Sequence, residues 1–220
     1  MKKKFYNKVV LGVLFVFPLV VYLFFASGKN NFAKLPVLTS GVNELPLKPN
    51  SKDSLQLKNK ITVLGYWGGD LNLKKAEALN LNEKIYKRFY EFSDFQFVFF
   101  VDNEHFNQVE TLLLNLEEGV GTDITKWNFI PSTQTQIQAH FKSLNTPLTL
   151  DVNGSTPYVF IIDKNLNLRG RDDDEEEGIL YGFDARSVAE INKKMIDDVK
   201  VILADYRLAL KIYNKTNRKK

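Results

Sequence analysis

The chain has no cysteine among its 220 residues. This absence excludes disulfide bonds, thiolate nucleophiles and thiolate metal sites together. Histidine is nearly as scarce, with only His105 and His140, so a histidine-based zinc or copper site has few ligands to draw on. Because the two histidines fall on separate predicted helices or loops, we expect each of them to be an ordinary surface or helix-face residue. We expect no metal, no other cofactor and no catalytic group.

Acidic residues are absent from both ends of the chain. Residues 1–34 contain six lysines and residues 211–220 contain five basic residues, with no acid in either stretch. The residues between them carry 19 basic and 26 acidic side chains, so the net charge of +4 conceals an acidic domain. Nucleic-acid binding requires a basic face on the folded domain itself. We therefore expect no nucleic-acid partner.

Charged residues are also absent from Val9 to Ala26, an apolar run of 18 residues. At about 1.5 Å per residue, a helix of this length comes close to the hydrocarbon thickness of a bilayer. Four lysines precede the run and two follow it closely, which favours a cytoplasmic N-terminus. We expect residues 1–28 to be a cytoplasmic N-terminus and a single-pass transmembrane anchor, with the domain in the periplasm or another extracytoplasmic space. A cleaved signal peptide ending near Ala26-Ser27-Gly28 is the alternative.

The exported part is predicted to divide into three regions. Residues 29–58 contain Pro36, Pro46 and Pro49 among scattered polar residues, which is typical of a stalk or linker. Within it, Leu35 to Leu38 has the apolar character of an edge strand that docks on the domain. Residues 59–213 are predicted to form one domain, and residues 214–220 a basic tail.

Strand and helix patterns alternate along the domain. Strands are predicted at 61–66, 95–101, 127–130 and 179–181, with a hairpin at 158–163 and 166–170. Helices are predicted at 81–92, 107–118, 132–144 and 188–213, the last two with Ser132 and Ser187 as N-caps. A parallel βαβ start, an antiparallel hairpin and a closing helix are typical of the thioredoxin arrangement, an α/β fold.

Several segments together resemble the Sco/SenC family of membrane-anchored, thioredoxin-fold proteins. Val98 to Asp102 is similar to a family strand that ends in Asp, and Lys126 to Phe129 is similar to its Trp-x-Phe strand. In layout the resemblance covers roughly Leu35 to Tyr213. It implies a thioredoxin-like fold preceded by one transmembrane helix and a stalk. It also implies a role in assembling the copper site of respiratory cytochrome oxidase.

The copper ligands of that family do not carry over to this chain. The Cys-x-x-x-Cys pair of the family belongs in Gly68 to Leu73, which reads Gly-Gly-Asp-Leu-Asn-Leu. Its ligand histidine belongs near Gly154 or Ser155, where no histidine occurs. Copper(I) prefers thiolate and imidazole ligands. The resemblance therefore implies a non-enzymatic variant without copper or thiol redox chemistry, which acts by binding a protein partner among oxidase assembly components.

The candidate partner-contact residues flank the altered site. They are Trp67, Gly69, Asp70, Asn153, Thr156 and Pro157. Trp67 either contacts a partner or packs against the stalk or core. Thr156-Pro157 resembles the proline of thioredoxins that is cis and faces the active site, so we expect a cis bond and a retained docking edge.

Other functions stay open at this stage. Asp70 and Asp151 would be general acid–base carboxylates of an enzyme if they converged on one pocket. The long C-terminal helix would instead dimerise the chain as a structural scaffold. The acidic run Asp172 to Glu177 lacks the alternation and turn glycine of a calcium loop, so we expect a solvated loop there.

Overall fold

The computed structural model describes residues 2–27, 34–46, 55–121 and 123–217. The chain divides into two compact units, Met1–Ala33 and Lys34–Lys220. The first contains α1 (Lys2–Ser27), whose described apolar side chains, between Val10 and Phe24, are nearly all exposed. Among the described helices, none has both the length and the apolar character that crossing a membrane requires.

The globular unit begins well before the predicted domain boundary at residue 59. Leu35, Val42, Leu45 and Leu57 are buried, and β1 (Val37–Ser40) pairs with the sheet. The predicted docking of the Leu35 to Leu38 segment is thus confirmed, whereas the separate stalk is wrong for residues 34–46 and 55–58. The reason is that these residues bury apolar side chains that a solvated linker would expose. The rest of the predicted stalk, at 29–33 and 47–54, lies outside the described residues.

A mixed sheet in the order β1-β6-β5-β2-β3-β4 forms the centre of this unit. Strands β2 (Ile61–Tyr66), β3 (Phe95–Asp102) and β4 (Trp127–Ser132) are mutually parallel. The antiparallel half consists of β5 (Tyr158–Ile162) beside β2, then β6 (Asn167–Arg169) and β1, with β9 (Phe183–Asp184) also pairing β5. This pairing confirms the predicted βαβ unit followed by a hairpin.

Strands β2 and β3 are buried at every position because both faces of the sheet are covered. On β3, Phe97 and Phe99 join one core while Val98 and Phe100 join the other. The Phe99 ring packs directly against the backbone of Gly65, where an added Cβ would lie 2.2 Å from the ring atom Cε1. The near-continuous apolar run of β3 therefore reflects its central place in the sheet.

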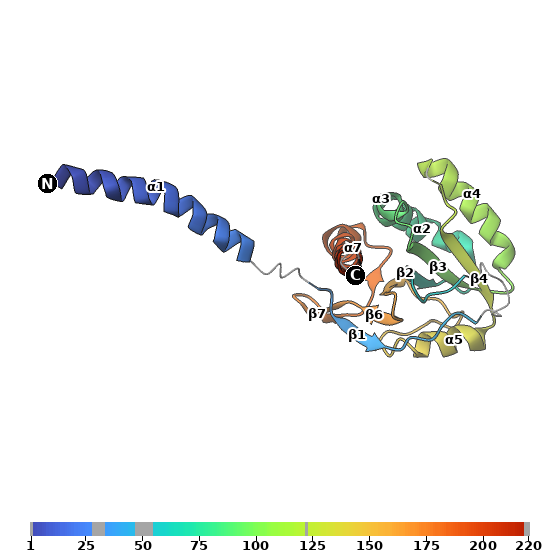
Figure 1. Cartoon of the computed structure of the whole chain (residues 1–220). Coiled ribbons are helices and arrows are strands. Elements are labelled where there is room, and N and C mark those ends of the chain that lie inside the picture. The colour runs from blue at the N-terminus through green and yellow to red at the C-terminus, as the bar shows by residue number, and fades with distance from the viewer. Residues whose placement is uncertain (1, 28–33, 47–54, 122, 218–220) are drawn as a thin grey trace. The chain divides into compact units, whose positions relative to one another are not determined.

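Helices cover the two faces unequally (Figure 1). One face is covered by helices that contribute Leu81, Leu116 and Val199 to its core. These are α2 (Lys75–Leu81), which continues through η2 (Asn82–Tyr86) into α3 (Lys87–Phe89), then α4 (Val109–Val120) and α7 (Ile196–Asn217). The other face is covered by α5 (Gln134–Lys142) and by the chain around Val42 and Leu45. Short helices precede α4 and α7, namely η3 (Phe106–Gln108), α6 (Val188–Glu190) and η4 (Ile191–Met195).

Two local predictions are corrected by hydrogen bonding. Ser132 ends β4 and does not cap α5, because Thr133 forms the capping box with Gln136. The acidic run is not only a loop, since β7 (Arg171–Asp174) and β8 (Gly178–Leu180) pair as a hairpin around it. Asp174 is buried and accepts a hydrogen bond from Lys194 Nζ at 2.8 Å. Ser187 caps α6 as predicted.

Candidate functional site

The loop after β2 meets the segment before β5 at the carboxyl ends of β2 and β3. Trp67 forms a bridge with Ser155, and the amide of Thr156 donates to the carbonyl of Tyr66 at 3.0 Å. Gly68 passes so close to Asn153 that an added Cβ would lie 1.8 Å from the carbonyl oxygen of Asn153. The two segments that carry the candidate residues are therefore in direct contact.

Trp67 does not belong to the exposed part of that surface. Its side chain is 0% exposed, and its ring stacks on Phe99 with 3.9 Å between centroids. The alternation of β2 continues one residue past the strand and directs this ring into the core with Trp127. The role of Trp67 as a partner contact is therefore wrong, and its alternative as a packing residue holds.

The Thr156–Pro157 peptide bond is trans, so the expected cis bond is wrong. The chain continues from the Ser155 bridge directly into β5, which begins at Tyr158. Along this path the Pro157 carbonyl accepts from the amide of Ala185 at 3.0 Å. Hydrogen bonds to Tyr66 and Ala185 on either side thus fix the extended path through Thr156 and Pro157.

A buried carboxylate fixes the loop after β2. Asp102, at the end of β3, accepts hydrogen bonds from the amide of Gly69 and from the amide and ring Nδ1 of His105, the last at 2.8 Å. Gln108 Oε1 accepts from the amide of Leu71 at 2.8 Å. Burial raises the pKa of Asp102, but the donors from Gly69 and His105 outweigh burial and lower it below its ordinary value. The stretch Gly68 to Leu73 is therefore held from two points of the β3–α4 connection.

Two clefts flank this loop. The first, which we call the Asp102 cleft, has a volume of about 330 Å³ and is lined by Gly69 and Asn153 together with Asp102, His105 and Gln134. Gln134 Nε2 donates to the Asn153 carbonyl, while its Oε1 has no partner. Two of the predicted contact residues, Gly69 and Asn153, therefore line a polar cavity.

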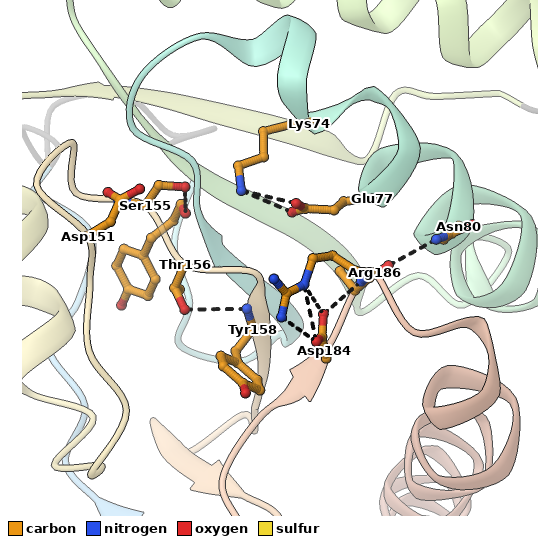
Figure 2. Close-up of polar contacts among 11 residues, drawn as sticks. Lys74, Glu77, Asn80, Asp151, Ser155, Thr156, Tyr158, Asp184 and Arg186 are labelled. Atoms are coloured by element: carbon orange, nitrogen blue, oxygen red, sulfur yellow. Dashed lines mark hydrogen bonds and ion pairs between the residues drawn. The ribbon is translucent and has the colours of Figure 1, made fainter.

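The second cleft, which we call the Pro157 groove, has a volume of about 460 Å³. Thr156 and Pro157 line it with Lys74, Tyr158 and residues 147–151. Figure 2 shows the Lys74–Glu77 pair and the Asp184–Arg186 pair beside Thr156 and Tyr158. Lys74 Nζ lies 3.1 Å from the buried Glu77. Burial raises the pKa of Glu77, and Lys74 opposes that rise.

Asp70 and Asp151 do not converge on a shared pocket. Asp70 is exposed and caps the 3-10 helix η1 (Leu71–Lys74) by accepting from the amide of Asn72, which lowers its pKa. Asp151 is exposed and accepts from the amides of Asn153 and Ser155 at 2.9 and 2.8 Å. Asp151 lines the Pro157 groove, whereas Asp70 lines neither cleft. Both carboxylates stabilise turns of their own segments.

The two histidines differ in environment. His105 is partly exposed and paired with Asp102. His140 lies on a helix, as one of the two expectations had it, but it is not a surface residue: α5 turns it inward to the Tyr66 hydroxyl, 2.7 Å from its Nδ1. Burial lowers the pKa of His140 to about 4. In the described part of the chain, no three histidine, aspartate or glutamate side chains gather closely enough to hold a metal ion.

Sequence patterns alone did not single out Gln108, Gln134 or Lys74 as residues of this site. Asp102 gave a usable signal, because an acidic residue directly after a buried strand must lie at an edge of the sheet. Gln108, Gln134 and Lys74 gave none, since each reaches the site from a helix or a loop and has an ordinary polar identity.

Comparisons with known proteins were made by sequence and by structure. No family model and no curated protein matches the sequence. BsSco, a member of the Sco family of cytochrome c oxidase assembly proteins, has a similar structure, with 11% identity, a TM-score of 0.50, and 80% of this chain and 96% of that chain covered. A SCO1/SenC family lipoprotein from Bacillus anthracis has 16% identity and a TM-score of 0.48, with 80% of this chain and 99% of that chain covered. A putative protein disulfide isomerase from Bacteroides thetaiotaomicron has 14% identity and a TM-score of 0.44, with 78% of this chain and 95% of that chain covered. The likeness to BsSco confirms a thioredoxin-like α/β fold, and at such low identity it shows the fold alone.

Proposed function

We propose that this chain is a non-enzymatic, Sco-like binding protein that serves as an accessory in respiratory cytochrome oxidase assembly. It would act from a membrane anchor in an extracytoplasmic space, without copper or thiol redox chemistry. The oxidase assignment rests on the fold and on the sequence resemblance to the Sco/SenC family. The binding role rests on the Pro157 groove and on the exposed apolar residues Leu73 and Val152.

Two large apolar side chains that are exposed to solvent directly adjoin, in sequence, residues that line the Pro157 groove. Leu73 is 78% exposed and Val152 is 95% exposed, and their neighbours Lys74 and Asp151 line the groove. Exposed apolar residues on loops next to a cleft are typical of contact surfaces. No hydrogen bond joins the main chain of Thr149 or Leu150 to other described residues. The groove thus offers free backbone groups and apolar contacts to an extended segment of a protein partner.

The hydrogen bonds that hold the loop after β2, which we call the clamp, support binding without redox chemistry. Hydrogen bonds to Asp102 and Gln108 fix the backbone from Gly69 to Leu71, and the chain contains no thiol to react. A rigid loop loses little conformational freedom when a partner binds, so more of the contact energy contributes to affinity. We assign this loop a docking role in place of the cysteine pair that the family carries there.

Membrane attachment is supported by the first unit. The exposed residues of α1 from Val10 to Phe24 are apolar apart from Gly12, Pro18 and Tyr22, and lysines precede them in the sequence. Extraction of cell membranes with alkaline carbonate tests this part of the proposal. The anchored chain stays in the pellet, whereas release of the full-length chain into the supernatant would rule out the anchor.

Affinity capture with substituted full-length chains tests the binding role. Leu73→Asp and Val152→Asp place a charge on the proposed surface, and Ile179→Asp places one on a comparably apolar exposed position of β8. We expect the first two to abolish recovery of oxidase subunits from detergent-solubilised membranes, with the third unchanged. Recovery of an unrelated transporter, or equal recovery by all variants, would overturn the proposal.

Copper(I) titration of the same chain tests the absence of copper chemistry. Without thiolates and with His140 buried against Tyr66, we expect no stoichiometric binding at submicromolar concentrations. Stoichiometric binding in that range would contradict the proposal, whatever the result of affinity capture.

A further inference from the structure

The outer side of α4 carries a groove that the proposed function does not use. It has a volume of about 420 Å³, and its floor includes Phe106, Leu113 and Ile124. Leu114 also lines it and is 53% exposed. Glu110 and Glu117 line the same groove, and neither forms an ion pair with another described residue. We call this the α4 groove.

The lining residues of α4 follow a helical repeat. Glu110, Leu113, Leu114 and Glu117 occur at positions i, i+3, i+4 and i+7, which places two leucines between two carboxylates on one face. A helix that fits this face brings apolar side chains for the leucines and cations for the two carboxylates. The charge and the repeat together define the chemistry of the occupant.

The C-terminal end of α7 carries that chemistry in its sequence. The last buried side chain among those described on α7 is Leu203, yet the helix continues to Asn217, about 21 Å further at 1.5 Å per residue. No acidic residue follows Asp205. Leu208 and Ile212 are four positions apart, and so are Lys211 and Lys215, so this segment combines two apolar residues with two cations at helical spacing.

We propose that the α4 groove binds the C-terminal end of α7 from a second copy of this chain. Each copy then donates its α7 end and accepts that of its partner, so the contact is reciprocal and closes as a two-fold dimer. Leucine and isoleucine fill the apolar floor, and the lysines face Glu110 and Glu117. The contact lies outside the Pro157 groove, so dimerisation and partner binding occur on separate surfaces.

The cysteine-free sequence makes a cross-linking test unambiguous. Two differently tagged full-length chains, one carrying L114C and the other I212C, are mixed in detergent micelles and mildly oxidised. We expect a disulfide-linked pair containing both tags, and twice the monomer mass for the native chain by light scattering. The exposed L73C paired with I212C is the control and gives no cross-link. A third chain that carries both L114C and I212C tests for a contact within one molecule. A monomeric mass for the native chain, or a disulfide that forms only within this doubly substituted chain, would overturn the proposal.

Charge reversal separates the proposed contact from a general effect on folding. E110K with E117K in one chain converts two attractions into repulsions, and we expect about tenfold weaker cross-linking to I212C. Adding K211E and K215E to the second chain restores the yield. Restoration requires direct pairing of the two helices, so a reversed pair that stays weak contradicts the proposal. L73D and V152D leave cross-linking unchanged, which makes this test independent of the proposed function.

Discussion

At the scale of single residues, the contact between Gly68 and Asn153 sets the shape of the site. A Cβ on Gly68 would lie 1.8 Å from a main-chain oxygen that cannot rotate away. We predict that Gly68→Ala lowers the free energy of unfolding by about 1–3 kcal/mol, the usual cost of overpacking. Urea unfolding followed by the fluorescence of buried Trp67 and Trp127 measures it.

Gly119→Ala is the matched control for that substitution. Gly119 lies inside α4, and its added Cβ would meet only Leu79 Cδ2 at an ordinary 3.4 Å. Alanine in a helix is favoured over glycine by about 0.5–1 kcal/mol, so this variant should be slightly more stable. Equal destabilisation by both alanines would show that the close approach at Gly68 is not the cause.

His140 predicts a specific pH dependence of stability. Burial lowers its pKa from 6.5 to about 4, so between these pH values the unfolded chain binds a proton that the folded chain does not. Stability therefore falls as the pH falls from 6.5 to 4, by about 3 kcal/mol from this group. Above pH 6.5 the histidine is neutral in both states and contributes no pH dependence.

His140→Phe removes this proton while keeping an aromatic ring beside Phe100. We expect the difference in unfolding free energy between wild type and variant to shrink or change sign as the pH falls from 6.5 to 4. His105→Asn serves as the control, because His105 is partly exposed. Parallel stability curves for wild type and His140→Phe would exclude a depressed histidine pKa.

At the scale of elements, α5 shows which residue begins the helix. Thr133 Oγ1 accepts from the amide of Gln136, and the Gln136 side chain accepts from the amide of Thr133. We predict that Thr133→Ala costs about 1 kcal/mol, whereas Ser132→Ala costs less, because among the described residues the Ser132 Oγ hydrogen-bonds only to the Ile130 carbonyl, at 3.4 Å. Thermal unfolding of the two alanine variants compares them. A larger loss for Ser132→Ala would contradict the observed cap.

The same elements show what sequence patterns can and cannot predict. Strands β2 and β3 were predictable because apolar runs of six to eight residues have few other uses in a small domain. The clamp was not, because Gly69 and Asp102 are 33 positions apart and their contact leaves no periodic signal. The burial of His140 depends likewise on Tyr66, 74 positions away. Contacts between residues so far apart in sequence arise only when the chain folds, so no local sequence pattern predicts them.

At the scale of the whole molecule, the segment before β2 belongs to the folded unit. Val42, Leu45 and Leu57 pack against the α5 face, and Leu35 packs on the other face of the sheet. Burying four such side chains contributes about 6–12 kcal/mol, which is comparable with the total stability of about 5–15 kcal/mol of an ordinary domain. Removing residues 34–58 should therefore unfold the domain and not merely weaken it.

Two shortened chains test this prediction. Residues 34–220 should unfold in a single cooperative transition in urea, whereas residues 59–220 should show no cooperative transition, because β6 loses its partner β1 and one core loses its outer layer. Within residues 34–220, Leu57→Ala should cost about 2–5 kcal/mol, since Leu57 is fully buried. Val37→Ala is its control at a position that is 45% exposed. If residues 59–220 unfold with the same midpoint as residues 34–220, the segment is a linker and the buried contacts of Val42, Leu45 and Leu57 contribute nothing to stability.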